Sequence, residues 1–209
     1  HDYLKIIYKF TNLNNQKEIN QANAHLMQSY YSYEYLKDKL KNLHFLFDFQ
    51  NRNILKSIKH LGKKENLICY SHKSNEYINL LKNSSRENFI ELKGFTSKEI
   101  IRIFQKTKLY IDFGYHPGKD KMPREAVLFN NCVITNLKGS AYNKFDIPIN
   151  KKYKFKQNYK NLNQINFTID KILKNYKTEV RNFKNYKKKI LNEEKLFKKQ
   201  LLKIFFKQK

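Results

Sequence analysis

A basic loop in the middle of the chain carries residue types that suit a phosphorylated ligand. Its basic residues and glycines are Gly114, Gly118, Lys119, Lys121 and Arg124. A helix N-terminus leaves backbone N–H groups unpaired and carries partial positive charge, so basic side chains beside it attract an anion. Glycine lets the backbone approach a ligand where a Cβ would block it. We therefore predict an anion site here, before a helix that begins near Arg124, with phosphate as the anion.

A second segment of small residues, Gly139, Ser140 and Ala141, can approach a phosphate in the same way. The glycines form neither a GxGxxG sequence nor a Walker loop, which removes support for nicotinamide binding and for ATP hydrolysis. Ser140 lacks the GxSxG frame of a nucleophile elbow. The histidines and cysteines have no metal-ligand spacing and no Asp-x-Asp pair occurs, so we predict no metal site.

Loops that bind a ligand need a scaffold that brings them together, and the pattern after Glu65 predicts one. Apolar runs alternate with helical patterns in the order NLICY, NEYINLLKN, FIELKG, SKEIIRIFQKT, LYIDFG, PREAVLFN and CVIT. This alternation is typical of a parallel sheet with helices on both faces, so we predict a Rossmann-like α/β unit. Ligands of such sheets bind beyond the carboxyl ends of the strands. The loops expected to converge there are 71–74, 94–96, 114–120 and 135–141.

The segments on either side of this unit have different patterns. Residues 1–50 contain a strand at 3–10, a polar loop at 11–15, helical patterns at 21–40 and a short strand at 44–49, which is less than a complete domain. A connector or short helix follows at 51–61. We expect the α/β domain to occupy residues 51–156 and C-terminal helices to occupy residues 157–209.

The last helical segment, 179–208, has an apolar stripe among its lysines. The stripe consists of Phe183, Tyr186, Ile190, Leu196 and Leu201. An amphipathic helix of this kind packs its stripe on the body of its own chain. A basic face opposite aromatic residues also suits acidic lipid headgroups, so a helix on a membrane surface is the alternative.

The formal charge of +25 also allows nucleic-acid binding, because neutralised phosphates release their counterions. Only five of the 43 basic residues are Arg, and Asn, Ile, Tyr and Phe are abundant. This composition indicates coding bias, in which lysine is a general surface residue. The aromatic residues lie at core spacing instead of forming one basic platform. We expect no specific nucleic-acid partner.

Cys69 and Cys132 lie in apolar strand-like runs, as buried thiols in a reducing compartment do. No run of about 18 apolar residues is present to span a membrane. We expect a cytoplasmic location and leave open a contact with the inner face of an acidic membrane. Because His1 begins inside a strand-like run, we also expect a protein cut at its N-terminal side.

The stretch from Tyr110 to Ile149 combines these features in one order: a basic loop, Glu125-Ala126 at a helix start, an apolar helix, an Asn-Asn turn, the strand CVIT and a Gly-Ser loop. This order resembles the nucleotide-sugar-binding half of retaining glycosyltransferases with the GT-B fold. HPGKDKMPREA and GSAYNKFDIPI are similar to sequences in a group of bacterial GT-B glycosyltransferase-like proteins, and HLMQSYYSYEYL and ICYSHKSNEYI resemble their upstream segments. The resemblance covers nearly the whole chain but matches the second half of a two-domain enzyme.

The resemblance implies a glycosyltransferase that takes a nucleotide-diphospho-sugar as donor, a glycan or lipid-linked molecule as acceptor, and no cofactor. Residues 1–50 would be the end of the acceptor domain. Glu125 would hold the ribose hydroxyls of the donor. The residues near the diphosphate would be Lys73, Lys119 and Arg124, with the glycines of both loops beside them.

One part of the family pattern is missing. That pattern places a second Glu eight residues before Glu125, near the transferred sugar, and here the position is Pro117. His116 or Asp120 would take over its role, and with Arg124 they are the candidate catalytic residues. The missing Glu also motivates a second hypothesis, a non-catalytic module that binds nucleotides or glycans. A basic nucleic-acid-binding protein is the third hypothesis.

Overall fold

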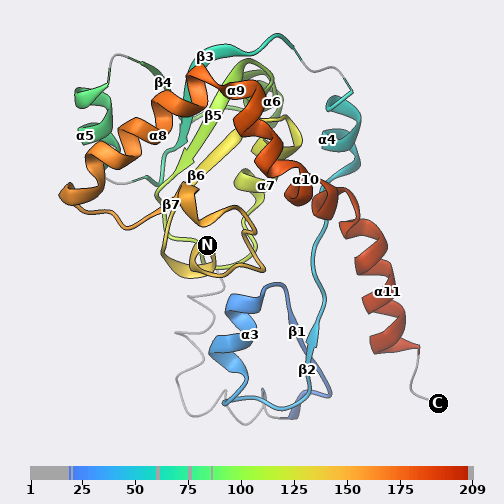
Figure 1. Cartoon of the computed structure of the whole chain (residues 1–209). Coiled ribbons are helices and arrows are strands. Elements are labelled where there is room, and N and C mark those ends of the chain that lie inside the picture. Colours follow the sequence, from blue (N-terminus) through green and yellow to red (C-terminus); the bar gives the residue numbers. More distant parts are fainter. Residues whose placement is uncertain (1–18, 20, 60–61, 75–76, 86, 207–209) are drawn as a thin grey trace.

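The computed structural model describes residues 19, 21–59, 62–74, 77–85 and 87–206. At its centre is a five-stranded parallel sheet with helices packed around it (Figure 1). The strands are β3 (Glu65–Ser71), β4 (Asn88–Leu92), β5 (Thr107–Asp112), β6 (Cys132–Asn136) and β7 (Lys154–Phe155). Their order is β4-β3-β5-β6-β7, and every neighbouring pair is parallel. The predicted α/β, Rossmann-like fold is confirmed.

Helices α5 (Tyr77–Ser84), α6 (Ser97–Lys106) and α7 (Lys121–Leu128) connect successive strands of the sheet. Helix α8 (Leu162–Lys174) packs beside α5 and contacts β5, whereas α6 contacts β3 and β5, and α7 contacts β5 and β6. Because crossovers between parallel strands are right-handed, α5 lies on one face of the sheet and α6 and α7 on the other. The strands are therefore covered on both sides, and all five residues of β6 are buried.

A smaller unit precedes the sheet. Strand β1 (His25–Met27) pairs in parallel with β2 (Leu43–Phe45), and α3 (Tyr30–Leu36) lies between them in the sequence. The sequence predicts helical patterns throughout 21–40, and β1 shows that the first part of this prediction is wrong. The helix begins late because Ser29 is extended, with φ −146° and ψ 155°, and its Oγ accepts a hydrogen bond from the backbone N–H of Ser32.

Other predictions for the first 61 residues have mixed outcomes. The strand predicted at 44–49 corresponds to β2, which is shorter and begins one residue earlier. The short-helix interpretation of 51–61 corresponds to α4 (Arg52–Ser57). The strand predicted at 3–10 and the loop predicted at 11–15 lie outside the described residues.

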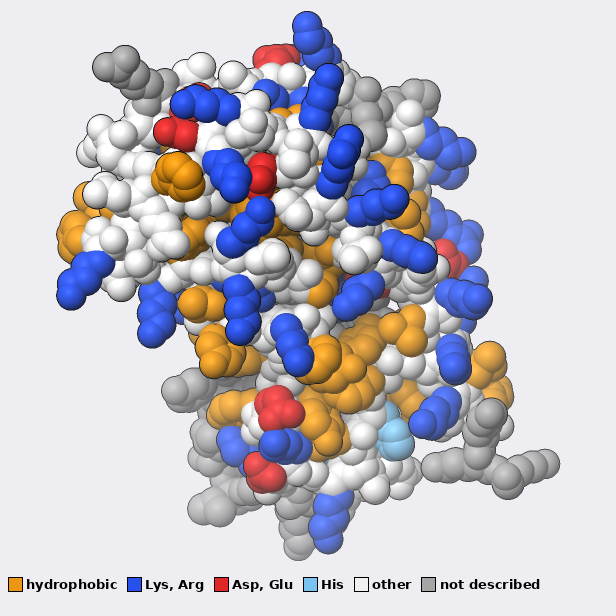
Figure 2. Space-filling view, in the orientation of Figure 1, with side chains coloured by type: hydrophobic (Ala, Val, Ile, Leu, Met, Phe, Trp, Pro, Cys, Tyr) orange, Lys and Arg blue, Asp and Glu red, His pale blue; other side chains and the backbone are white. Residues whose placement is uncertain are grey.

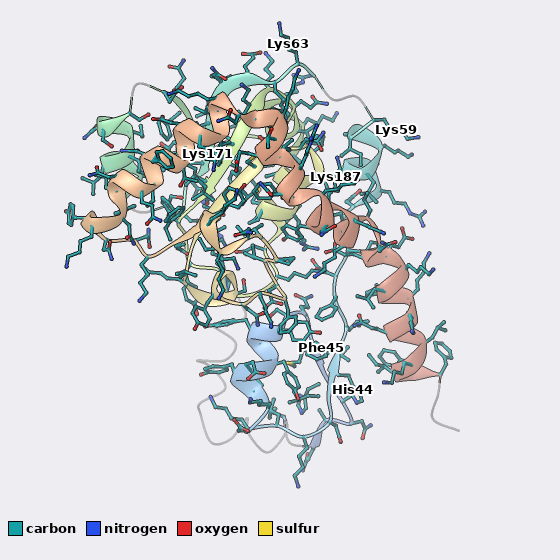
Figure 3. The ribbon with its side chains drawn as sticks, in the orientation of Figure 1. His44, Phe45, Lys59, Lys63, Lys171 and Lys187 are labelled. Atoms are coloured by element: carbon teal, nitrogen blue, oxygen red, sulfur yellow. The ribbon has the colours of Figure 1, made fainter. Side chains whose placement is uncertain are left out.

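Aromatic rings and one carboxylate connect the smaller unit to the sheet domain. The ring of Tyr30 lies 4.7 Å from that of Phe45 and 4.6 Å from that of Phe145. The carboxylate of Asp146 accepts hydrogen bonds from the backbone N–H groups of Tyr30 and Tyr31, both at 2.8 Å. Figure 2 shows hydrophobic side chains gathered over the region of α3, β1 and β2. In Figure 3, Phe45 lies beside the exposed His44 on β2.

The C-terminal part consists of short helices. After α8 come α9 (Tyr176–Glu179), a 3-10 turn (Val180–Phe183), α10 (Lys184–Leu191) and α11 (Glu193–Phe205). The prediction of one helix at 179–208 is therefore wrong. Asn192 separates α10 from α11, and its side chain donates to the carbonyl of Lys188 at 3.0 Å instead of supporting a continuous helix. The 3-10 turn at Val180–Phe183 interrupts the segment a second time.

The apolar stripe of this part is fully buried only over its first half, and in the second half Leu201 is half-buried. Phe183, Tyr186 and Ile190 are buried, whereas Leu196 is 41% exposed.

Helix α11 extends away from the sheet (Figure 1). It contacts the segment after β2, where the ring centroids of Phe49 and Phe197 lie 5.0 Å apart and the backbone N–H of Phe47 donates to the side chain of Gln200 at 3.0 Å. Within the described residues, no helix combines the length and the apolar character needed to cross a bilayer.

Candidate functional site

A cavity of about 340 Å³ opens at the carboxyl ends of β3, β4 and β5. Ser71, Leu92 and Asp112 end these three strands and line the cavity. β3 and β5 are neighbours in the sheet although β4 lies between them in the sequence. The chain places β4 on one side of β3 and then crosses to place β5 on the other side, so the strand order reverses between β3 and β5. Open parallel sheets bind ligands at such a switch point. The loops 71–74, 94–96 and 114–120 converge on the cavity as predicted, whereas 135–141 does not line it.

Three exposed lysines, Lys73, Lys93 and Lys121, line this cavity. The Nζ of Lys121 lies 3.3 Å from Oε1 of Glu125. Lys73 and Lys93 form no ion pair with any residue that the structure describes. Lys73 and Lys93 therefore place two positive charges without an ion-pair partner on one part of the wall, while the carboxylates of Asp112 and Asp120 also line the cavity. The lysine part of the cavity favours an anionic group.

Helix α7 adds to this positive potential. It begins at Lys121, three residues earlier than the sequence predicts, and Pro123 lies in its first turn. Proline is accepted there because the N–H groups of the first turn have no partner within the helix. Lys121 and Met122 line the cavity, so the start of the helix dipole lies at its wall.

A buried histidine joins two carboxylates at the edge of the cavity. Nδ1 of His116 is hydrogen-bonded to Oδ2 of Asp120, and Nε2 lies 3.8 Å from Oδ1 of Asp112. Burial lowers the pKa of His116, but the bond to Asp120 and the charge of Asp112 outweigh it, so the pKa is raised above its ordinary value. Asp112 and Asp120 line the cavity, whereas His116 lies behind them.

Two basic residues of the predicted site lie elsewhere. The guanidinium of Arg124 is 1% exposed and lies 2.9 Å from Glu193 and 2.6 Å from Asp48. Nζ of Lys119 lies 2.7 Å from the same carboxylate of Glu193. Burial lowers the pKa of Lys119, although Glu193 acts in the opposite direction. Both cations connect separate segments of the chain, and neither lines the cavity.

Glu125 is also outside the cavity lining. It is buried in α7, and its Oε1 approaches only Lys121, without the geometry of a hydrogen bond. Burial raises the pKa of Glu125, while the charge of Lys121 opposes this shift.

The predicted glycines shape the loop 114–120 and do not line the cavity. A Cβ on Gly114 would lie 2.9 Å from the Cβ of Lys73 and 3.1 Å from Oδ1 of Asp112, so the absence of a side chain lets the loop pass between them. Gly139 has φ +57°, and a Cβ there would lie 2.0 Å from the carbonyl oxygen of His116. Gly118 has more room, since the nearest atom to its Cβ position is 3.9 Å away.

Ser140 and Ala141 support this loop from behind. The backbone N–H of Ser140 donates to the carbonyl of His116 at 2.8 Å, and its Oγ donates to the carbonyl of Gly118. The carbonyl of Ala141 accepts a hydrogen bond from Nζ of Lys154 at 2.7 Å. The segment predicted to meet a phosphate therefore holds the His116 backbone in place.

Two exposed aromatic residues form part of the cavity rim. Phe95 is 41% exposed and Tyr115 is 44% exposed. The hydroxyl of Tyr115 lies 2.5 Å from the hydroxyl of Tyr31 on α3. The smaller unit therefore reaches the rim of the cavity.

No family model matches the chain, and no curated protein matches it at a significant level. Among the described residues, no group of three or more His, Cys, Asp or Glu side chains is arranged to hold a metal ion. What the cavity binds must follow from its own geometry and charge.

The residues that line the cavity include Lys93, Asp112 and Tyr115, which sequence reasoning did not single out for the site. Asp112 is the last residue of β5, and Lys93 directly follows β4. Both belong to the carboxyl ends of strands, and this position was the signal that could have identified them. Tyr115 follows Gly114 in the predicted loop but has no local signal, because its partner Tyr31 is remote in the sequence.

Proposed function

We propose that this chain is the donor-binding part of a glycosyltransferase, which moves a sugar from a nucleotide-diphospho-sugar to a glycan or lipid-linked acceptor. One observation carries the proposal: Lys73 and Lys93 line the switch-point cavity without an acidic partner among the described residues. The phosphate groups of a donor would supply the negative charge that these lysines lack. The resemblance of residues 110–149 to GT-B enzymes supports the same ligand.

In this proposal the diphosphate lies between Lys73, Lys93 and the start of α7. During transfer the bond between sugar and diphosphate breaks, and negative charge grows on the departing diphosphate. Fixed positive charges at that position stabilise the transition state, and binding both substrates in one orientation lowers the entropic part of the barrier. The exposed ring of Phe95 is available to stack on the nucleobase.

The acceptor would approach from the side of the smaller unit. Tyr31 of α3 contacts Tyr115 at the cavity rim, so this unit borders the position of the transferred sugar. Lys119 and Arg124 have no part in binding the diphosphate, because Glu193 and Asp48 already neutralise them. In this proposal Lys93 binds the diphosphate, a role that the sequence analysis gave to Lys119 and Arg124.

The proposal is tested by thermal unfolding of the chain with UDP-, GDP-, ADP- and dTDP-sugars. A ligand present at 100 times its Kd adds about 2.7 kcal/mol to the free energy of unfolding. We expect one nucleotide to raise the unfolding temperature, and Lys73→Ala and Lys93→Ala to abolish the shift. Lys188→Ala, on the exposed side of α10, is the matched control and should retain it. The absence of a shift with every nucleotide in the folded wild-type chain would contradict the proposal.

A second function is favoured by a separate observation. Lys119 and Arg124 form ion pairs outside the cavity, and Pro117 stands at the position of the missing Glu. The cavity therefore has fewer side chains that could assist sugar transfer than the resemblance implies. The chain would then be a non-catalytic module that binds a nucleotide-sugar. Hydrolysis or transfer of the sugar, measured with the bound donor and abolished by Lys73→Ala, would exclude this second function.

A further inference from the structure

A second cavity, of about 210 Å³, lies at the other end of α7 from the first. Lys121 and Met122, at the start of this helix, line the first cavity, whereas Val127, near its end, lines the second. Val180 and Phe183, from the 3-10 turn before α10, complete the apolar part of the second cavity. The two cavities have no lining residue in common, so a molecule in the second cavity leaves the donor site open.

The apolar part of this second cavity is recessed. Val127 is 1% exposed and Phe183 is 2% exposed. Helix α7 ends beside them, where Asn130 has a left-handed backbone with φ +61°, a conformation that asparagine adopts at the ends of helices. Cavities that enclose a drug-sized ligand have about 300 Å³ or more. The second cavity is smaller, and it suits one apolar side chain better than a whole molecule of that size.

Three cations border the apolar part: Arg181, Lys184 and Lys187. None of them forms an ion pair with a carboxylate in the part of the chain that the structure describes. Nζ of Lys187, which lies on α10 (Figure 3), donates a hydrogen bond to the neutral side chain of Asn130 at 2.6 Å. Burial lowers the pKa of Lys64 to about 7, and repulsion from Lys187 contributes to this shift. An anionic group beside the three cations would relieve the repulsion.

The occupant must therefore combine negative charge with a small apolar group. The bases of a nucleic acid stack on exposed aromatic rings, whereas the ring of Phe183 is buried. A bilayer surface is contacted through exposed apolar side chains, whereas here Arg181 and Lys184 are exposed and the apolar residues are not. A peptide can insert one side chain into a recess while its neighbours remain at the rim. An acidic peptide therefore fits both parts of the cavity.

We propose that the second cavity binds an acidic peptide segment of a partner protein. One apolar side chain of the peptide fills the space beside Val127 and Phe183, and carboxylates on either side of it pair with the three cations. The buried apolar side chain contributes most of the binding free energy, while the charges orient the peptide and speed its association. The inference does not rest on the proposed function, because the donor cavity is a separate site.

Selection from a random heptapeptide library displayed on phage tests the inference, with the whole chain as bait at physiological salt. The library is counter-selected on Lys184→Glu, which reverses an exposed charge at the cavity. We expect the selected peptides to share one apolar residue with acidic residues on both sides of it. Selection of no peptide, or of peptides without this pattern, would overturn the inference.

Fluorescence anisotropy with the selected peptide that binds best separates the apolar contact from the charged one. Replacing its apolar residue by Ser should weaken binding to the wild-type chain about tenfold or more, because the burial of apolar area is lost. Lys184→Glu should weaken the unchanged peptide by a similar factor. Lys160→Glu, at an exposed lysine before α8, is the matched control and should retain the wild-type affinity.

The comparison of the two peptides uses the wild-type chain, so it is independent of variant folding. Equal affinity of the two peptides would overturn the apolar contact, and equal weakening by Lys184→Glu and Lys160→Glu would overturn the cavity as the site. Vesicles of phosphatidylglycerol and an oligothymidylate test the other partners. If either binds the wild type more tightly than the peptide and loses this binding in Lys184→Glu, a membrane or a nucleic acid is the partner and the peptide is not.

Discussion

The guanidinium of Arg124 and the carboxylate of Glu193 lie 2.9 Å apart, although 69 positions separate them in the sequence. Both side chains are almost completely buried, and Nζ of Lys119 binds the other carboxylate oxygen at 2.7 Å. Glu193 is the first residue of α11. One acidic side chain therefore fastens the last helix to the loop that borders the cavity.

We expect Glu193→Gln to lower the free energy of unfolding by about 3 kcal/mol, as breaking a buried ion pair does. Two buried cations lose a negative charge, and Asp48 remains as the partner of Arg124. Urea unfolding of the variant and the wild type measures the difference.

The neighbouring residue provides the control for this prediction. Glu194 pairs with Arg52 at 3.1 Å and with Lys198 at 2.9 Å on the surface. Surface pairs contribute little to stability, so Glu194→Gln should unfold at the wild-type urea concentration. Equal destabilisation by the two substitutions would mean that the charge of Glu193 is not what fixes α11.

Gly139→Ala should destabilise the chain by at least about 2 kcal/mol, because the new Cβ needs both a left-handed backbone and space occupied by the His116 carbonyl. It should also weaken the binding of nucleotides, since the displaced backbone belongs to the loop 114–120. Gly118→Ala lies in that same loop, with the nearest atom 3.9 Å from the Cβ position, and should leave stability nearly unchanged. Thermal unfolding of both variants tests the difference.

The parallel sheet could be predicted because its strands are covered on both faces and therefore appear as continuous apolar runs. β7 gave no such signal. It has only two residues, Lys154 and Phe155, and depends on pairing with β6 and on the bonds of Lys154 to the carbonyls of Ala141 and Asn143. β1 escaped prediction for a related reason, because three residues flanked by polar sequence have no period of their own.

Residues of the candidate site could be predicted from the sequence where the end of a strand or the start of a helix places them at the cavity. Lys73 follows β3 and Asp120 precedes α7, and both line the cavity. Lys119 and Arg124 have the same loop and the same charge, but their carboxylate partners come from β2–α4 and α11. No local pattern reveals a partner that is 69 or 76 positions away. For this reason the sequence could not separate the structural cations from the lysines of the cavity.

Neither cysteine should react with a thiol reagent in the native state. Burial raises the pKa of Cys69 to about 12, despite a bond to Thr107, and burial also raises the pKa of Cys132. The reactive thiolate is therefore scarce and inaccessible. We expect two thiols to react with DTNB in urea and none in buffer at pH 8. Rapid reaction of either thiol in buffer would contradict the burial of that strand.

Binding to DNA or RNA should be micromolar or weaker at physiological salt and should fall steeply as salt rises. On the face that Figure 2 shows, Lys and Arg side chains are spread widely over the sheet domain. Fluorescence anisotropy with a labelled oligonucleotide measures the affinity and its dependence on salt. Salt concentrations from about 50 to about 200 mM span the range in which counterion release is seen. Nanomolar binding at the upper salt concentration would favour the nucleic-acid hypothesis over the donor site.

The contribution of Glu179 to the free energy of unfolding should decrease as the pH falls. Burial acts to raise the pKa of Glu179, but the Tyr153 hydroxyl at 2.5 Å and Lys152 Nζ at 3.0 Å outweigh it, and the pKa lies below its ordinary value of 4.5. The folded state therefore favours the carboxylate. Its contribution is fully present above pH 4.5 and is lost as pH falls through the lowered pKa.

Urea unfolding of the wild type and of Glu179→Gln across this pH range tests the sign. The wild type should be the more stable protein at pH 7, because the carboxylate accepts hydrogen bonds that connect α9 to the segment before β7. The difference should shrink steadily at acid pH, where the protonated Glu179 resembles the amide. A difference that stays constant down to acid pH would show that the substitution acts through packing and not through the charge.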